Sequence, residues 1–480
     1  MIANETEKHA MGETLPLFTP MFNKSVNIES RPEHLTAESG ALIQREIMER
    51  SGIIDWLAER LHDPRKPELI TYPLSDLLRT HLLLLGQGWR DQDDADRLRQ
   101  DPGLRVSNSA RRGTTPLDEE HVLASQPTLS RLVSLLSQDD NRGVLRQAIA
   151  ELAGRRLRLD NQGRRQQTMM IDVDSLPVEV HGHQHGSEWN GHYHRRMYHP
   201  LVASCAETGD MLDGLLRPGN AHTADGALRF ILGLVDRCKA RLCHSAIVRI
   251  DAGFPDNDTL SGLESREVPY VARIRNNQVL GRLAEPYLKR PVGRPPQIPR
   301  EWCYEERYQA KSWKKPRRVV LVVVERPDDL FLDHFWLITS LDAKRYPADK
   351  LLALYRKRGK AEAHMGELMD VLDPALSSAR RPKQDGPVVQ TSTDTGVRAN
   401  NETLLLLNLL AYEILHMGRT LMEKATREGW SLRRFRERIL RVASRVIRHG
   451  RRLTFVIAQS AAGDWQRLWR KLNRLRWAPG

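Results

Sequence analysis

The sequence predicts an α/β protein in which helices flank a mixed sheet, with a helical region before it and a basic region after it. Two observations predict this class. Between about residues 161 and 275, strand-like apolar runs first follow one another across a tight turn and then alternate with helical segments. Before that stretch, apolar residues recur at intervals of three and four, the period of a helix. A chain of 480 residues is long enough for several domains and a full core.

The first part of the chain is predicted to be helical. Residues 1–35 are expected to form a loose leader and residues 36–160 a helical DNA-binding domain, since ALIQREIMERSGIIDWLAERL and PLSDLLRTHLLLLGQGW carry the helical period. Another helix is predicted to begin near Pro127, because proline is favoured in a first turn. Short helices of this kind suit DNA recognition, although a plain helical scaffold has the same spacing.

The middle of the chain is predicted to form the α/β core, whose first part is residues 161–275. TMMIDVDSL is its first strand, YHPLVASCA and MLDGLLRP form a hairpin, and SAIVRI and PYVARIR follow helices. Residues 276–345 break this alternation with a proline-rich basic linker and three strand-like runs, so we expect an inserted β-rich subdomain. Helices over 346–425 are expected to complete the core.

The net charge of +13 predicts a polyanionic partner. Fourteen Lys and Arg and only two acids lie between Ser431 and Gly480, so nearly the whole excess sits in the last tenth of the chain. Residues 426–480 are predicted to be a basic helical region, because RRFRERILRVASRVIRHGRR mixes Arg with Leu, Ile and Val at helical spacing. We expect phosphate binding there, although a solvated face over a buried stripe gives the same pattern.

Other features exclude a secreted or membrane protein. The four cysteines form no CxxC pair and indicate reduced packing residues. No basic segment followed by a long apolar run opens the chain, and the longest apolar stretch, 404–415, is too short to span a bilayer. We therefore expect a cytoplasmic protein without a membrane partner.

Two acidic motifs lie at the ends of predicted strands. Asp172 and Asp174 are alternate residues of one strand, so they face the same way, and Asp251 ends a later strand. Strand ends of an α/β sheet are the usual place for a site. A single aspartate in such a position is more often a turn or capping residue.

A third acidic motif lies on a predicted helix that runs from Asp349 to Met369. Tyr355, Arg358 and Glu362 are spaced by three and four, which places them on one face. A carboxylate there can hold a metal while its neighbours grip phosphate oxygens. A surface ion pair is the ordinary alternative, but the order of the three motifs around a mixed sheet favours one shared site.

Histidines also gather in the chain, with six between His181 and His199. His181, His183 and His185 would share one face of a strand and could bind zinc there. We favour instead polar residues of a loop near DNA, because no cysteine accompanies them.

Together these motifs resemble the DDE transposases of bacterial insertion sequences, most closely the insertion-sequence 1380 group. The resemblance runs from about Ile53 to near the C-terminus. It is carried by LASQPTLSRL at 123–132, DVDSLPVEVHGHQHG at 172–186, NGHYHRRMYHPLV at 190–202, RIDAGF at 249–254, YxxRxxxE at 355–362 and LRVASRVIRHGRRLTF at 440–455. It implies an RNase H-like catalytic core.

The resemblance also implies the site residues. Asp251 would be the second acid and Glu362 the third. Both Asp174 and Asp172 can be the first, and we favour Asp174 because the two residues after it partly fit the family's pattern.

Further positions match the family less evenly. Tyr355 and Arg358 match residues that approach the DNA backbone in this family. The pattern expects a Lys where this chain has Met369, so one phosphate contact is absent or is supplied elsewhere, for example by Lys360 or a C-terminal Arg.

The implied activity is metal-dependent DNA cleavage followed by strand transfer. The acids would hold two ions of Mg²⁺, with Mn²⁺ as a substitute, about 4 Å apart. The partners would be the inverted-repeat ends of the element and target DNA, bound by a homo-oligomer. Two alternatives remain: a structure-selective nuclease that cuts without joining, and a decayed copy that only binds DNA.

Overall fold

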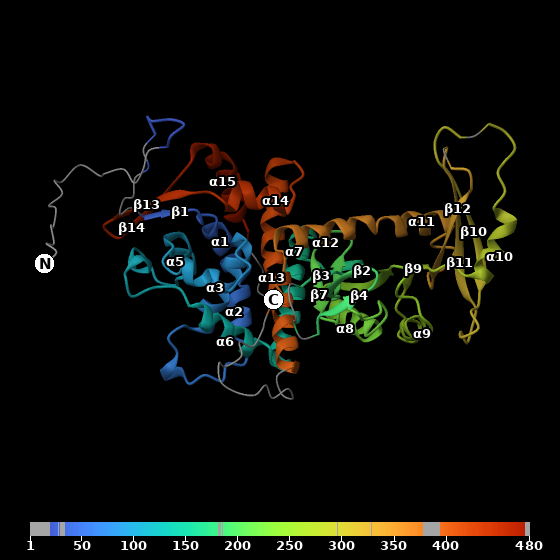
Figure 1. The fold of residues 1–480 in the computed structure, drawn as a ribbon, viewed down its shortest axis with the longest axis horizontal. Coiled ribbons are helices and arrows are strands. Elements are labelled where there is room, and N and C mark those ends of the chain that lie inside the picture. Colours follow the sequence, from blue (N-terminus) through green and yellow to red (C-terminus); the bar gives the residue numbers. More distant parts are fainter. Residues whose placement is uncertain are drawn as a thin grey trace.

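The computed structural model describes residues 20–26, 28, 34–180, 184, 186–294, 296–327, 329–377 and 394–475. These residues form an elongated molecule with helices at one end, a mixed sheet in the middle and the inserted strands at the other end (Figure 1). Most of the predicted leader lies outside the described residues. A short strand at its end is described, β1 (His34–Thr36).

The N-terminal region is helical, as the periodicity predicted. Its helices are α1 (Ala41–Ser51), α2 (Ile53–Ala58), α3 (Leu74–Gln87), α4 (Asp94–Leu98), α5 (Pro102–Asn108), α6 (Gln126–Leu136) and α7 (Asp139–Asp160). Gly52 separates α1 from α2 with a φ of 64°, a left-handed conformation that favours glycine. Pro127 lies in the first turn of α6, as expected.

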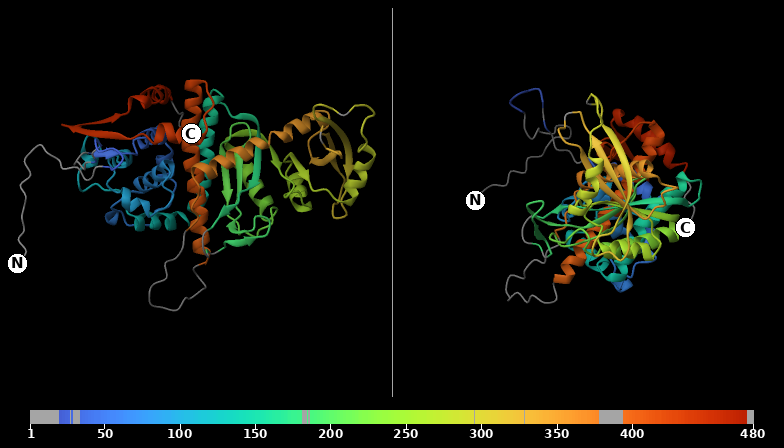
Figure 2. Two further views of the ribbon diagram at one scale, coloured as in Figure 1. Left: turned by 45° about the horizontal axis from the view of Figure 1, so that its top comes forward. Right: turned by 90° about the vertical axis from the view of Figure 1, so that its right-hand side faces the viewer.

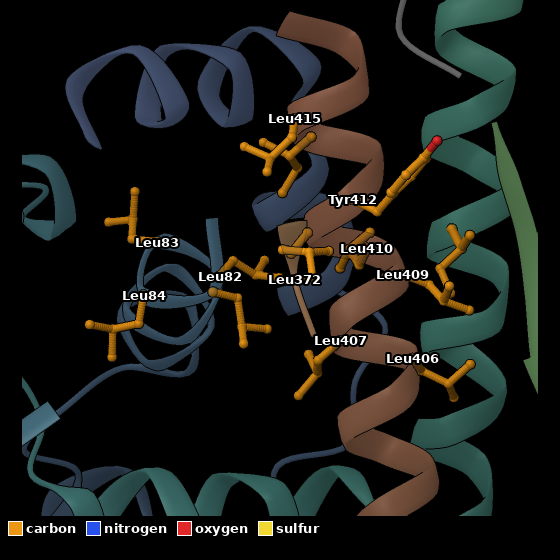
Figure 3. Packing of buried hydrophobic residues seen from close by; sticks show 14 of the residues in the cluster. Leu82, Leu83, Leu84, Leu372, Leu406, Leu407, Leu409, Leu410, Tyr412 and Leu415 are labelled. Atoms are coloured by element: carbon orange, nitrogen blue, oxygen red, sulfur yellow. The ribbon is translucent and has the colours of Figure 1, made fainter. Parts of the chain in front are cut away.

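A helix of 33 residues, α13 (Asp394–Thr426), runs through the centre of the largest core. Figure 3 shows Leu406 and Leu409 on the side of α7 and Leu407 on the side of α3. Because neighbours cover it on nearly every side, most of its residues between 404 and 417 are buried and apolar, and the few polar ones among them are buried as well. Over the described residues, no helix has the length and apolar character that crossing a membrane requires.

Eight strands form one mixed sheet in the order β10-β11-β12-β9-β8-β2-β6-β7. The core strands are β2 (Gln166–Ser175), β6 (Leu201–Cys205), β7 (Met211–Leu215), β8 (Cys243–Ile250) and β9 (Tyr270–Ile274). β6 and β7 form an antiparallel meander beside β2, whereas β8 and β9 run parallel to it. This order and these directions are those of an RNase H-like fold, so the predicted fold class is confirmed.

Both faces of the sheet are covered. On one face, α8 (Ala227–Arg241) and α9 (Asn257–Ser265) pack against residues such as Ile171 and Val248. On the other face, α11 (Ala348–Arg356), α12 (Gly359–Val371) and α13 contribute to two further clusters. Burial on both faces explains why the strands read as nearly continuous apolar runs.

The inserted region consists of α10 (Gln278–Ala284) and the strands β10 (Arg300–Tyr308), β11 (Arg317–Glu325) and β12 (Asp333–Thr339). All three strands are antiparallel to their neighbours, and β12 pairs with β9. The insertion therefore continues the sheet of the core.

The helix predicted from Asp349 to Met369 is divided in two. α11 ends at Arg356 and α12 begins at Gly359, with tight i→i−3 hydrogen bonds from Arg358 to Tyr355 and from Lys360 to Lys357. The segment between the helices has no apolar side chain to pack, and Gly359, a poor helix former, follows it, which favours a break there.

The prediction of a helical C-terminal region is wrong for residues 444–457. After α14 (Leu432–Phe435) and a π-helical turn (Arg436–Leu440), the chain forms the hairpin β13 (Ser444–His449) and β14 (Arg452–Ile457), and then α15 (Gln459–Leu472). β1 adds to the free edge of β13. The β-branched residues and the turn at Gly450, whose φ is 57°, favour a hairpin over a helix.

Candidate active site

Strand pairing brings the first two acidic motifs side by side. In the parallel ladder of β2 and β8, Asp172 is the partner of Arg249 and Val173 is the partner of Ile250. Asp174 and Asp251 are the next residues, so they lie at the same edge of the sheet. The Asp251 carboxylate also accepts a hydrogen bond from the amide of Gly253 at 2.8 Å, which holds the turn that follows β8.

Arg358 joins the third acidic motif to the first. One of its guanidinium nitrogens donates to Asp174, and the other donates to Glu362 with Nη1 and Oε1 2.5 Å apart. The side chains of Arg358 and Asp174 are largely buried, whereas Glu362 is 61% exposed and open to a ligand. The predicted pairing of Arg358 with Glu362 on successive helical turns is present despite the break between the helices.

The electrostatics of the site agree with this arrangement of the three motifs. Burial raises the pKa of Asp174 to about 6; Arg358 lowers it, and the negative charges of Asp251 and Glu362 raise it. Burial works to lower the pKa of Arg358, but the same three carboxylates raise it above its ordinary value. Each acid therefore lies within electrostatic range of one guanidinium.

Asp172 has a different environment from Asp174. Both of its oxygens accept hydrogen bonds from Arg249, with Oδ1–Nε 2.6 Å and Oδ2–Nη2 2.7 Å, and both side chains are almost fully buried. Arg249 also donates to the carbonyl of Leu354 at the end of α11. Both oxygens of Asp172 are thus engaged in a buried ion pair that links β2 and β8 to α11. Asp174, in contrast, faces the other acids.

Tyr355 and Arg358 line a cavity of about 330 Å³ that adjoins Asp251. Burial raises the pKa of Tyr355, and the guanidiniums of Arg358 and Arg273 lower it. Arg273 lies over the ring of Phe335, 5.1 Å from its centre. The cavity is therefore a cationic and partly aromatic space at the edge of the acidic site.

Two neighbours of the acids had not been predicted. Arg273 belongs to β9, and Tyr193 belongs to the turn between β4 (Glu188–Asn190) and β5 (Arg195–Tyr198). Burial and then the charges of Asp174 and Asp251 raise the pKa of Tyr193, so its hydroxyl lies within electrostatic range of both acids. Tyr193 lay within a segment that carried the family resemblance, but a turn residue gives no periodic signal of its role.

Two other predictions concerned Met369 and the histidine cluster. Met369, at the position where the resemblance led us to expect Lys, is half-buried and packs against the core around α13. His181, His183 and His185, the residues of the zinc hypothesis, lie outside the described residues.

The carboxylates have the chemistry to bind a divalent cation, but their positions in this structure do not form a coordination site. They are hard oxygen donors, and they already surround one cation, the Arg358 guanidinium. As the described side chains stand, no three His, Cys, Asp or Glu residues form a group that could hold a metal ion. A metal would therefore have to take the place of Arg358 between Asp174 and Glu362.

A polar network fixes α12, the helix that carries Glu362. Glu367 binds Arg419 of α13 with Oε2 and Nη1 2.8 Å apart, and Arg419 contacts His416 at 2.6 Å. His416 lies 3.8 Å from Asp210, which forms a buried ion pair with Arg156 of α7. Through this chain of contacts, α12 is tied to α13, to the turn between β6 and β7, and to α7.

An RNase H-like sheet with acids at the end of β2, directly after β8 and on the neighbouring helix α12 defines the class of the protein. The chain belongs to the family described as "Transposase DDE domain group 1", whose model matches residues 18–479. It is therefore a member of the DDE transposases, enzymes of DNA transposition and recombination that bind DNA and generally use divalent metal ions.

Comparison with curated proteins finds no match. Among solved structures, the chain is similar to a piggyBac transposase in a synaptic complex with hairpin DNA. The two share 11% sequence identity over 83% of this chain and 79% of that one, with a TM-score of 0.41. Since this overlap is loose, the family assignment depends on the family model.

Proposed function

We propose that this protein is a bacterial transposase of the insertion-sequence 1380 group. It binds the inverted-repeat ends of its element, cuts phosphodiester bonds there by two-metal chemistry, and joins the 3′ ends to target DNA. The observation that carries the proposal is the convergence of Asp174, Asp251 and Glu362 on Arg358. Family membership supports DNA as the substrate.

In this proposal Asp174, Asp251 and Glu362 are the metal ligands. Two Mg²⁺ ions, or Mn²⁺ in their place, would activate the attacking oxygen and stabilise the leaving oxygen when bound. Arg358 leaves the carboxylates and binds a phosphate oxygen of the strand being cut. Tyr355, beside it on the cavity wall, positions that strand with its hydroxyl.

We assign Asp172 a supporting part. Its pair with Arg249 fixes the register of β2 and β8 on either side of the site, so that Asp174 and Asp251 stay adjacent. Both of its oxygens accept from one buried guanidinium, whereas Asp174 accepts from Arg358 and from the amide of Ser175 and is less buried, which favours Asp174 as the first metal ligand.

The proposal divides the chain by task. Residues 36–160 and 426–480 bind DNA, residues 161–275 and 346–425 form the catalytic core, and residues 276–345 are the insertion. The enzyme acts as a homo-oligomer on paired ends, in the cytoplasm at the nucleoid. The net charge of +13 supports binding to a polyanion.

A strand-transfer assay tests the proposal. The substrate is a labelled duplex with one pre-cut end of the element, taken from the DNA that flanks the coding sequence, and a supercoiled plasmid is the target. With Mg²⁺, the wild-type chain should join the label to the plasmid. Asp251→Asn should lower the rate by roughly a thousandfold, because one oxygen ligand to the metals is lost. Asp258→Asn, an exposed aspartate of α9, is the matched control.

The two alternatives give different results in the same assay. A nuclease that does not join strands would cut the labelled duplex but transfer no label to the plasmid. A decayed copy would bind the duplex and give the same background with Asp251 or Asn at position 251. Either result would overturn the proposed activity.

A further inference from the structure

The C-terminal hairpin is the most basic strand pair of the described chain, and one of its faces is exposed. Residues 444–457 contain four Arg and one His and no acidic residue. β13 and β14 pair over six residues each, from Ser444 opposite Ile457 to His449 opposite Arg452. In Figure 2 the hairpin lies over the N-terminal helices.

The two faces of this hairpin differ. On the inner face, Val446 is 4% exposed and its partner Phe455 is half-buried. On the outer face every side chain is exposed. We call this outer set the ribbon face; it consists of Arg445, Ile447, His449, Arg452, Thr454 and Val456.

The composition of the ribbon face indicates what can cover it. Ile447 and Val456 are 41% and 48% exposed, and Leu35 of β1 extends the apolar strip on the same side at 62%. Exposed apolar side chains that lie close together on regular strands can serve in an interaction surface. The accompanying side chains are cationic or hydroxylic, so the partner is negatively charged and rich in hydrogen-bonding groups.

Duplex DNA satisfies both conditions. The major groove of B-DNA admits a two-stranded β-ribbon. There, Arg can donate two hydrogen bonds to guanine, Thr can bond to several base edges, and branched apolar side chains can contact the thymine methyl group. If the ribbon contacted only phosphates, Ile447 and Val456 in the middle of its exposed face would have no apolar group to contact.

The surroundings of the hairpin fit the same partner. Arg448, on the inner face, binds Asp118 at 2.8 Å and so attaches the hairpin to the N-terminal helical region. Gly113 lies against the carbonyl of Arg451 at the tip, which brings the loop with exposed Arg111 and Arg112 beside the turn. Those two guanidiniums can hold the phosphates that border a groove occupied by the ribbon.

We propose that the ribbon face enters the major groove of the transposon end and reads its base sequence. The inference rests on the proposed function and adds the element of the chain that supplies recognition. Arg452 and Thr454 are assigned to base edges, Ile447 and Val456 to thymine methyl groups, and Arg111 and Arg112 to the backbone.

Binding by the full chain tests this, in EDTA so that no cleavage occurs. A duplex library with a randomised centre is first selected on the wild-type protein, and affinities are then compared for the enriched duplex and a shuffled one. The double variant Arg452→Ala, Thr454→Ala should reduce the preference for the enriched duplex by roughly ten- to a hundredfold, as expected for lost base contacts. Arg111→Ala, Arg112→Ala should weaken binding to both duplexes alike.

Arg229→Ala, an exposed Arg on α8, is the matched control and should leave the preference unchanged. The proposal is overturned if no sequence is enriched, or if the ribbon variant keeps the full preference. It is also overturned if the variant keeps the preference but dissociates an oligomer in gel filtration, since the face would then join two copies of the chain. Because these measurements need no metal, their outcome is independent of the Asp251→Asn assay.

Discussion

Asp172 and Asp174, two residues apart on β2, should respond in opposite ways when their charges are removed. The pKa of Asp174 is raised by burial to about 6 from an ordinary 3.8. Folding therefore favours its protonated form. The stability this contributes is fully present below pH 3.8 and is lost as the pH rises through 6. Asn resembles the protonated form, so Asp174→Asn should retain that stability at higher pH.

The magnitude follows from the interval between 3.8 and 6. At about 1.4 kcal/mol per pKa unit, the metal-free Asp174→Asn variant should be more stable than the wild type by about 3 kcal/mol at pH 8. The difference should fall to about half of that at pH 5, because the wild-type carboxyl is then mostly protonated.

Burial raises the pKa of the Asp172 carboxyl as well, but Asp172→Asn should destabilise the protein because it leaves a buried cation behind. It removes the negative partner of Arg249, whose guanidinium is about 1% exposed and cannot turn to water. Leaving such a charge buried and unpaired costs about 3 kcal/mol or more. The sign of the change in unfolding free energy thus distinguishes Asp174, whose negative charge destabilises the fold, from Asp172, whose negative charge stabilises it.

Urea unfolding in EDTA, followed by tryptophan fluorescence, measures both effects at pH 8 and pH 5. Asp258→Asn serves as the control for the loss of a surface charge. Added Mg²⁺ should stabilise the wild type but not Asp174→Asn, because a ligand that binds only the folded state raises its stability. The reasoning is refuted if Asp174→Asn unfolds at lower urea than the wild type at pH 8, or if Asp172→Asn unfolds at higher urea.

Three further predictions concern the same site and its support. Arg358→Ala should bind Mn²⁺ severalfold more tightly, measured by calorimetry, because no guanidinium then competes for the carboxylates, yet it should cleave DNA more slowly. Arg356→Ala is the surface control, and weaker Mn²⁺ binding by Arg358→Ala than by this control would contradict the prediction. Gly209→Ala should destabilise the chain by about 1–3 kcal/mol and slow cleavage, since φ is 80° and the new Cβ would lie 2.5 Å from the His364 ring on α12. Leu409→Ala, in the fully buried centre of α13, should lower the free energy of unfolding by about 2–5 kcal/mol without changing the Mn²⁺ affinity of the folded protein.

The sequence predicted those parts of the fold that local patterns determine. The strands around Asp174 and Asp251 could be recognised because each is a short apolar run bounded by turn residues. Their adjacency was expected from the rule that site residues gather at strand ends, and the parallel register of β2 and β8 provides it.

The parts that depend on tertiary partners could not be predicted. Nothing near Asp172 in the chain shows that Arg249, on another strand, takes up its charge. The break between α11 and α12 was missed because spacing by three and four continues across it. The C-terminal hairpin was taken for a helix because Arg, Val and Ile recur in a short segment at intervals that suit both periods.

The contact of Arg358 with two acids has a consequence for which ions the protein can admit. A guanidinium already neutralises part of the negative charge, so an incoming ion must outcompete it at the carboxylate oxygens. Potassium and sodium carry no more charge than the group they would displace, whereas a small doubly charged ion attracts the same oxygens far more strongly. At the proposed metal site the arginine would thereby set a threshold that abundant monovalent salts do not pass, before any coordination geometry is formed.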